Sequence, residues 1–418
     1  MVAPKRMICA ALFVVCVVGI DVGGVMAAWA QTALEDSVAR RPRPDFEPIG
    51  IVAGPAGSFL LFPALELQTR YTDNLFATDS GTISDEIFII KPEIKLRSDW
   101  DNHALNLAIG ARNAHHVKNP NEDWTDANFN ADGRYDIADL GRLRAALTLE
   151  QRHEARSSPD DPGNPNPTIF YRGVAELGGE YNPDALLLRL AVKVQRHDFR
   201  DNGSTNNDDR DRTIVEVRGR TGYEFTPGTT AFVEGALDNR DFDQKIDDAG
   251  FKRSSDGYEV LTGMTLDLSG VTFAELAAGY RRQRFDDPLL SDVQGVSFAG
   301  RLLWNPTDLL SLSARLRRLV KETTLSGASG VFTSVFSLKA DYEAADNLLF
   351  DAKVTLTVQD FDGIQRQDDS LSFEFGGKYL IGPNLYAGAR YSLENRASDA
   401  IGSDFTENRI RVFFGARL

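Results

Sequence analysis

From about residue 59 to its end, the chain alternates apolar and polar side chains with a period of two. One run sets an apolar series against charged and polar residues: Leu186, Leu188, Leu190, Val192 and Val194 against Arg189, Lys193 and Gln195. Successive side chains of a strand point to opposite faces. Each run therefore predicts a strand with one apolar face and one largely charged face, whereas a helical period would scramble both sets.

Two classes of connector take turns between the runs. Short connectors such as TPGT (226–229) carry the Pro, Gly, Asn and Asp that tight turns need, whereas long ones such as DNGSTNNDDRD (201–211) are polar and acidic. The runs are longer than an average globular strand, and their length suits a tilted membrane strand. Short turns alternating with long loops are typical of a membrane barrel.

The pattern predicts an all-β fold, namely a transmembrane antiparallel up-and-down β-barrel over residues 59–418. Counting the runs gives 18 strands: 60–76, 85–99, 103–117, 124–137, 141–156, 168–181, 185–198, 209–225, 229–242, 253–268, 271–285, 293–304, 309–322, 331–343, 347–361, 367–380, 385–397 and 404–418. Sixteen strands are also compatible, because the runs near 124–137 and 293–304 are only weakly apolar. An even number of strands places both termini of the barrel chain in the periplasm.

Aromatic residues gather near the predicted strand ends, as expected for the two interfacial girdles of a membrane barrel. One set lies beside the short turns or the start of the barrel: Phe62, Trp100, Tyr181, Phe225, Trp304, Tyr342 and Tyr379. The other lies toward the long loops: Tyr71, Phe88, Tyr171, Tyr258, Phe298 and Tyr391.

The first 30 residues predict a secretory signal peptide. Lys5 and Arg6 precede a short apolar stretch, and Ala28-Trp29-Ala30 is an A-x-A cleavage site. Residues 31–58, rich in Pro and charge, then predict an extended periplasmic lead-in. Both cysteines lie within the signal, so residues 31–418 hold no disulfide, thiolate metal site or cysteine nucleophile.

The last strand carries an apolar series that predicts both a lipid-facing surface and the assembly signal of a barrel: Ile410, Val412, Phe414, Ala416 and Leu418. Between these residues stand Arg409, Arg411 and Arg417.

If the apolar set faces lipid, the alternate set lines the lumen. The basic candidates are Arg97, Arg112, Arg142, Arg144, Arg189, Lys193, Arg218, Arg220, Arg315, Arg317 and Arg411, and the acidic candidates are Glu150, Glu216, Glu234 and Glu259. Charged rings set pore selectivity, so an excess of basic residues predicts attraction of anions. Pairing of these charges into salt bridges that fill the wall is an equally weighted alternative. Eighteen strands leave an interior that side chains alone do not fill.

The composition and motifs restrict which classes of partner and of chemical activity are compatible with the chain. The chain carries a net charge of -15, which becomes -16 without the signal because that segment holds two basic and one acidic residue. An acidic balance argues against nucleic acid as a partner. No H-E-x-x-H or G-x-S-x-G motif is present, and the neighbouring His115 and His116 point to opposite faces of a strand. We therefore predict no enzyme, no metal site and no cofactor.

Two stretches carry a family resemblance. Residues 40–76 contain an Arg-Pro lead, Asp45-x-x-Pro48-x-Gly50-Ile51 and Tyr71-x-Asp73-Asn74-x-Phe76, and residues 87–105 follow with IFIIKPEIKLRSDWDNHAL. Both resemble the bacterial outer-membrane proteins grouped as putative beta-barrel porin 2. Two features depart from the family: the stretch 53–57 looks enlarged, and Leu418 replaces the Phe usual at barrel ends.

The resemblance implies a multi-pass barrel in the outer membrane of Gram-negative bacteria, with loose links to exopolysaccharide production. We predict a porin-like channel that exports an exopolysaccharide or passes anionic solutes through a basic lumen. The predicted partners are outer-membrane lipid and lipopolysaccharide, the barrel assembly machinery and periplasmic polysaccharide-export components. A non-conducting structural or adhesive surface barrel is the alternative, and a barrel enzyme whose site is assembled from distant residues is the third.

Overall fold

The computed structural model describes residues 45–418 except residues 139, 204 and 269. The predicted signal peptide and residues 31–44 of the predicted lead-in lie outside the described residues.

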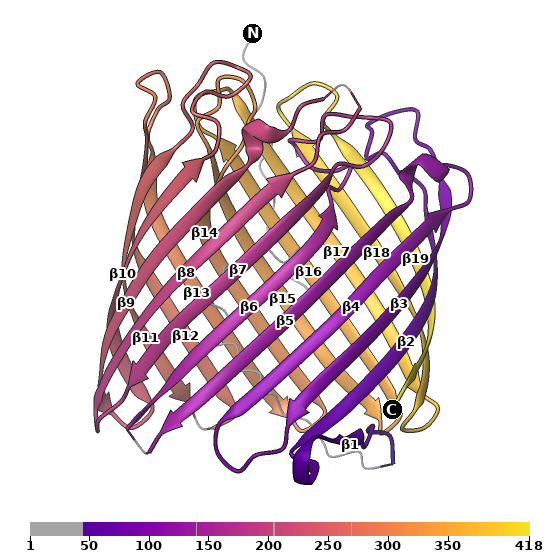
Figure 1. Cartoon of the computed structure of the whole chain (residues 1–418), viewed down its shortest axis with the longest axis vertical. Coiled ribbons are helices and arrows are strands. Elements are labelled where there is room, and N and C mark those ends of the chain that lie inside the picture. The colour runs from indigo at the N-terminus through magenta and orange to yellow at the C-terminus, as the bar shows by residue number, and fades with distance from the viewer. Residues whose placement is uncertain (1–44, 139, 204, 269) are drawn as a thin grey trace.

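The described chain is a closed antiparallel barrel of 18 long strands, with one short additional strand (Figure 1). The strands are β1 (Ile51–Ala53), β2 (Phe59–Thr72), β3 (Asp85–Ser98), β4 (Ala104–His116), β5 (Trp124–Ile137), β6 (Gly141–His153), β7 (Ile169–Tyr181), β8 (Leu186–Phe199), β9 (Arg212–Thr226), β10 (Thr229–Phe242), β11 (Ser255–Leu268), β12 (Thr272–Phe285), β13 (Val293–Thr307), β14 (Leu310–Lys321), β15 (Val331–Ala345), β16 (Leu348–Phe361), β17 (Arg366–Leu380), β18 (Leu385–Ser398) and β19 (Phe405–Arg417). Each long strand pairs with the next in sequence, and β19 pairs with β2 from Arg409↔Thr72 to Arg417↔Ala64, which closes the barrel.

The predicted count of 18 is confirmed, and the alternative of 16 is wrong. The two weakly apolar runs are the full strands β5 and β13. The β5 run looked weak because one of its faces is polar: Asp126, Asn128 and Asn130 take alternate positions and lie opposite Arg112, Gly110 and Ala108 of β4.

Strand β10 demonstrates how the period of two divides the wall into two faces. Glu234, Asp238 and Arg240 are buried, at 2%, 8% and 6% exposure, whereas Val233 and Leu237 are 50% and 66% exposed. Apolar residues thus face outward, where a bilayer would cover them, and charged residues face the lumen. The inward face is not uniformly polar, because Phe232 of β10 is buried beside Leu261 and Ala277 of the next two strands.

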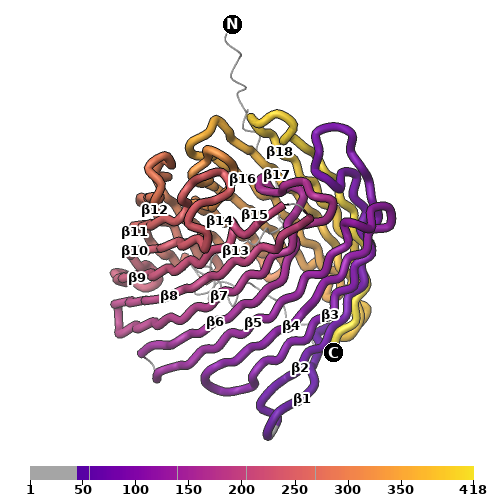
Figure 2. Tube along the Cα trace, turned by 45° about the horizontal axis from the view of Figure 1, so that its top comes forward, coloured from indigo at the N-terminus to yellow at the C-terminus, as the bar shows by residue number. Residues whose placement is uncertain are grey.

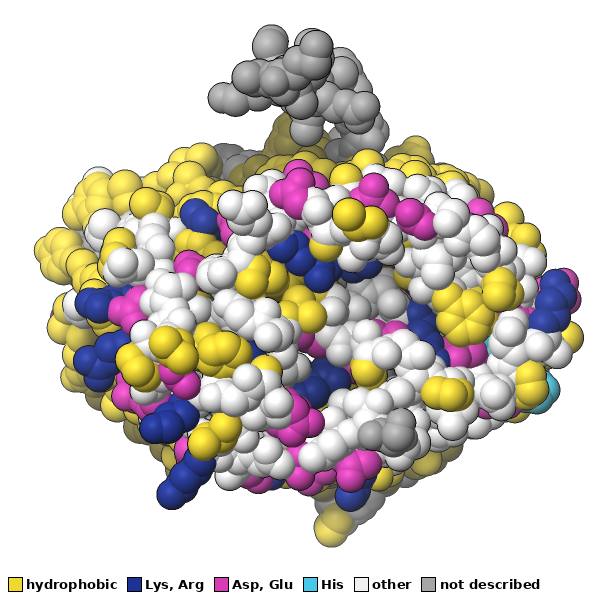
Figure 3. Space-filling model, turned by 90° about the horizontal axis from the view of Figure 1, so that it is seen from above, with side chains coloured by type: hydrophobic (Ala, Val, Ile, Leu, Met, Phe, Trp, Pro, Cys, Tyr) yellow, Lys and Arg dark blue, Asp and Glu magenta, His cyan; other side chains and the backbone are white. Residues whose placement is uncertain are grey.

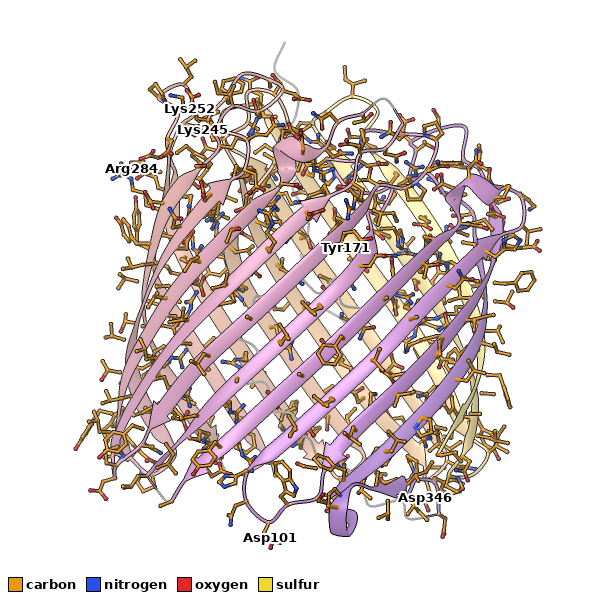
Figure 4. All side chains as sticks on the ribbon, viewed as in Figure 1. Asp101, Tyr171, Lys245, Lys252, Arg284 and Asp346 are labelled. Atoms are coloured by element: carbon orange, nitrogen blue, oxygen red, sulfur yellow. The ribbon has the colours of Figure 1, made fainter. Side chains whose placement is uncertain are left out.

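The two ends of the barrel differ in their connectors (Figures 1 and 2). We call the lower end in Figure 1, with β1 and the C-terminus, the short-turn rim, and the upper end the long-loop rim. In Figure 4, Asp101 and Asp346 lie at the short-turn rim, Lys252 and Arg284 lie toward the long-loop rim, and Tyr171 lies on the wall between them.

The outer aromatic residues follow the prediction at both rims with one exception. Trp100, Tyr181 and Tyr379 are 42%, 48% and 50% exposed near the short-turn rim. Phe62 instead takes an inward position of β2, opposite Lys95, and the guanidinium of Arg97 lies 5.2 Å from its ring centroid. The period of two places Phe62 on the same face as Glu66 and Arg70, so its apolar character misled the prediction.

Three 3-10 helices complete the described structure: η1 (Pro55–Gly57), η2 (Pro120–Glu122) and η3 (Asp208–Arg210). None of the described helices is long and apolar enough to cross a membrane. Strand β1 and η1 lie within the predicted lead-in, and β1 pairs with the first three residues of β2. Just before them, Phe46 packs on a cluster formed by Leu380, Tyr386 and Phe413, and its carbonyl accepts a hydrogen bond from Arg417 Nη2 at 2.8 Å.

Candidate functional site in the charged lumen

The structure places all the predicted lumen residues on the inward-facing set of their strands. On β9, Arg218 and Arg220 are buried, at 5% and 8% exposure, whereas the adjacent Val217 is 40% exposed. On β19, Arg411 alternates with Ile410 and Val412, which are 53% and 57% exposed. What differs around the barrel is how many of these charges have a partner.

On one side of the lumen, acids and bases interlock in what we call the paired cluster, formed by Arg218, Arg220, Glu234, Glu259, Glu275, Arg281 and Arg301 of β9–β13. Arg218 reaches Glu234 at 2.8 Å and Glu259 at 3.1 Å. Arg220 reaches Glu234 at 2.7 Å and Glu275 at 2.9 Å.

Two further guanidiniums complete the paired cluster. Arg281 approaches Glu259 at 2.8 Å, and Arg301 approaches Glu275 at 3.0 Å. Charge-assisted hydrogen bonds of this kind are stronger than neutral ones. Here the predicted basic and acidic residues largely neutralise one another, as the wall-filling alternative expects.

Neighbouring strands repeat this pairing on a smaller scale. Glu180 forms ion pairs with both Arg142, at 3.2 Å, and Arg189, at 2.5 Å. Glu150 accepts from Arg172 at 3.1 Å, and Lys193 lies 3.8 Å from Glu216. The partner Arg172 was not among the predicted lumen residues, although it stands on an inward position beside residues that were.

The closing seam of the barrel is different. Arg70 of β2, Arg112 of β4 and Arg411 of β19, which we call the seam trio, line the lumen without an acid within 4.0 Å among the described residues. Arg70 lies directly opposite Arg411, and Arg390 of β18 lies opposite Arg411 on its other side. Like charges directly opposite one another destabilise a sheet.

The acids near the seam are already engaged. Arg390 is held by Asp351 at 2.6 Å and by Glu374 at 2.9 Å. Glu407, which acts electrostatically on Arg70, accepts a hydrogen bond from Thr72 at 2.5 Å and lies 3.7 Å from Arg409. The seam trio therefore concentrates positive charge that pairing does not cancel.

A loop narrows the lumen near the long-loop rim. Residues 322–330, which join β14 to β15 and which we call the inner loop, contact segments from several other strands. Arg253, at 2% exposure, donates to the carbonyls of Thr323 at 2.7 Å and Ala328 at 2.8 Å. Asp160 of the 154–168 loop accepts from the Thr323 hydroxyl at 2.6 Å.

The inner loop is also fixed from β10, because Arg240 bonds to the carboxylate of Glu322. Seen from above, the mouth is hollowed and carries Lys and Arg side chains in its depth (Figure 3). The position of this loop could not be predicted from the sequence, because its contacts join residues far apart in the chain.

No group of three or more His, Cys, Asp or Glu residues suited to hold a metal ion occurs in the described part of the chain. Two neighbouring histidines do contact one carboxylate. His115 Nδ1 lies 2.6 Å and His116 Nδ1 3.4 Å from oxygens of the Asp123 carboxylate.

A family model described as putative beta-barrel porin 2 matches residues 43–417. The chain belongs to this family. The match spans all 18 long strands, so membership covers the barrel and the seam trio together. Family membership makes the chain a porin-like β-barrel.

Several solved structures are similar to this chain. OccK2 (OpdF) from Pseudomonas aeruginosa, in complex with glucuronate, is 12% identical with a TM-score of 0.45, covering 86% of this chain and 98% of that one. A BenF-like porin from Pseudomonas fluorescens is 12% identical with a TM-score of 0.44, covering 86% and 99%. OpdL from Pseudomonas aeruginosa is 13% identical with a TM-score of 0.43, covering 86% and 99%. No curated protein matches.

Proposed function

We propose that the protein is an outer-membrane channel that passes anionic solutes, including acidic polysaccharide. The seam trio carries this proposal. Three lumen-facing guanidiniums, two of them directly opposed across the closing strands, have no acid within 4.0 Å among the described residues. A fold gains no stability from opposing like charges, so their retention fits a role in attracting a passing anion.

The proposed orientation follows from the rims. In bacterial barrels the short turns face the periplasm and the longer loops face outward. The short-turn rim, with β1 and the C-terminus, would then be periplasmic, and an anion would leave the cell past the inner loop. Lipopolysaccharide would surround the outer face, and the barrel assembly machinery would insert the chain.

An exopolysaccharide is the cargo that the family association favours, and its transport would be export. It requires energy and synthesis from other components, since the barrel itself offers only a passage. We propose periplasmic polysaccharide-export proteins as partners at the short-turn rim. Glycosyltransferase genes and a chain-length regulator gene beside this one would support export, whereas a neighbourhood of small-molecule catabolic genes would favour small anions.

A non-conducting surface barrel is the second candidate, favoured by the paired cluster and by the inner loop, both of which occupy lumen space. Conductance of the pure protein in a planar bilayer separates the two. We expect discrete channel openings. The reason is that the seam trio, on β2, β4 and β19, lies on the side of the barrel opposite the paired cluster of β9–β13. A folded protein that inserts and gives no openings would favour the structural barrel.

The conductance test needs a matched control variant whose substitution lies outside the lumen. Arg282→Gln serves this purpose, because Arg282 is 44% exposed on β12 and pairs with Asp292 at 2.5 Å away from the lumen. Its conductance should equal that of the parent protein, which shows that losing an arginine as such does not alter the channel.

A further inference from the structure

The hydrogen-bonded ladder between β13 and β14 covers only part of the two strands. Their ladder runs from Thr307↔Leu310 to Ala299↔Arg317 and ends there. Beyond it, residues 293–298 of β13 pair only with β12, and residues 318–321 of β14 pair only with β15. The adjacent β11 and β12, by contrast, pair over their full length.

Past this point the upper end of β14 and β15 passes inside β13. Val320 and Phe332 take positions that would face outward in a regular barrel, yet they are 5% and 6% exposed. They pack in one cluster with Val293, an inward-facing residue of β13, and with Phe285. This apolar overlap seals the wall close to the long-loop rim.

A cavity of about 120 Å³ lies beside the last ladder pair, Ala299↔Arg317, both residues of which line it. Its lining combines lumen-facing side chains with residues from the gap itself. Phe298 and Arg318 are the first residues without a ladder partner on their facing edges, and both line it. The remaining lining residues are Arg218, Arg220, Glu234, Glu259, Leu261, Glu275, Ala277, Gly300, Arg301, Arg315 and Leu316.

The cavity is rich in positive charge. Six arginines and three glutamates line it. The three glutamates are engaged with arginines of the paired cluster. Arg318 has only a longer contact with Asp360, at 3.6 Å, and its guanidinium lies 3.9 Å from the Phe332 ring centroid.

Three buried nitrogens among these arginines have no hydrogen-bond acceptor in the described part of the chain: Arg218 Nη2, Arg301 Nη1 and Arg318 Nε. Arg218 Nη2 lies 3.3 Å from a Glu216 oxygen as an ion pair only. Buried polar groups are nearly always hydrogen-bonded, and an unmatched donor is costly. Arginines from three different strands, each with a buried donor that lacks an acceptor, therefore line one small cavity.

We propose that this cavity in the β13–β14 gap, hereafter the wall site, binds a single carboxylate or phosphate group. Guanidinium groups match the geometry of both anions. The wall site goes beyond the proposed channel activity, because a barrel that conducts nothing could still bind the anion. Its position in the wall admits two sources for the anionic group, namely a free solute in the lumen and the headgroup of a membrane amphiphile entering through the gap.

Equilibrium binding to the purified full-length barrel in a neutral maltoside detergent tests the wall site. The probes are inorganic phosphate and dodecyl phosphate, followed by ³¹P NMR titration. We expect saturable binding by the parent protein and at least about a tenfold loss of affinity in Arg318→Gln and Arg301→Gln, since each removes a charge-assisted donor. Tighter binding of dodecyl phosphate identifies a membrane amphiphile as the source, whereas equal binding of both probes identifies a free solute.

Two matched variants make the result specific. Arg282→Gln removes an arginine of the outer face of β12, and Arg196→Gln removes an exposed one from the outer face of β8, so both should bind like the parent. Heat-modifiable migration on gels checks that each variant is folded, and Arg318→Lys should retain part of the affinity. Unchanged binding in both Arg318→Gln and Arg301→Gln would overturn the proposal, as would an equal loss of affinity in Arg282→Gln and Arg196→Gln.

Discussion

Replacement of Phe414 by Asp should leave little or no folded barrel in the membrane. Phe414 is 46% exposed on the outer face of β19, and it lies opposite Ala387 of β18 and Leu67 of β2 at the closing seam. A charged residue on the lipid face costs up to about 2–4 kcal/mol at the bilayer midplane, with Asp less costly than Lys or Arg. The substitution also disrupts the apolar series that we predict the assembly machinery recognises.

Heat-modifiable migration of membrane fractions measures this effect. Ile401→Asp is the matched control, because Ile401 is fully exposed in the loop between β18 and β19, outside the lipid-facing wall. Leu418→Phe should also fold normally, since it restores the residue usual at barrel ends. Normal folding of Phe414→Asp would show that the last strand does not act as an assembly signal.

Neutralising Glu234 should strongly destabilise the folded barrel. Glu234 is 2% exposed and contacts both Arg218 and Arg220. Removing one partner of a buried ion pair typically costs about 3–5 kcal/mol, because a buried charge loses its compensation. We expect the free energy of unfolding of Glu234→Gln to fall by about 3 kcal/mol, since Glu216, Glu259 and Glu275 still compensate part of the charge.

Urea unfolding of the detergent-solubilised barrel, followed by tryptophan fluorescence, measures this change. Glu86→Gln is the matched control: Glu86 is exposed on β3 and has no ion pair among the described residues, so its effect should stay within about 0.5 kcal/mol. Equal stability of Glu234→Gln and the parent would mean that the paired cluster does not hold the wall together.

The strand count, the strand bounds and the two faces of the wall could be predicted because their causes are local. Turn residues, such as those at 226–229 between β9 and β10, mark where strands end. The period of two assigns each side chain to a face. The same local rule places Arg411 and Glu234 in the lumen. Phe62 demonstrates its limit, since an apolar residue can occupy an inward position.

The pairing of the charges could not be predicted, because it depends on which strands meet and in which register. Arg411 lacks an acid because its two neighbours across the seam carry Arg390 and Arg70. Glu234 is neutralised because β9 brings two arginines to it. The inner loop and the β13–β14 gap depend in the same way on packing between distant segments.

The reversal potential of the channel in a KCl gradient tests whether the seam trio selects anions. We expect a reversal potential of the sign set by chloride, shifted toward zero when Arg70, Arg112 and Arg411 are all replaced by Gln, and unchanged in Arg282→Gln. A parent channel whose reversal potential has the sign set by potassium would contradict the claim that the seam trio selects anions.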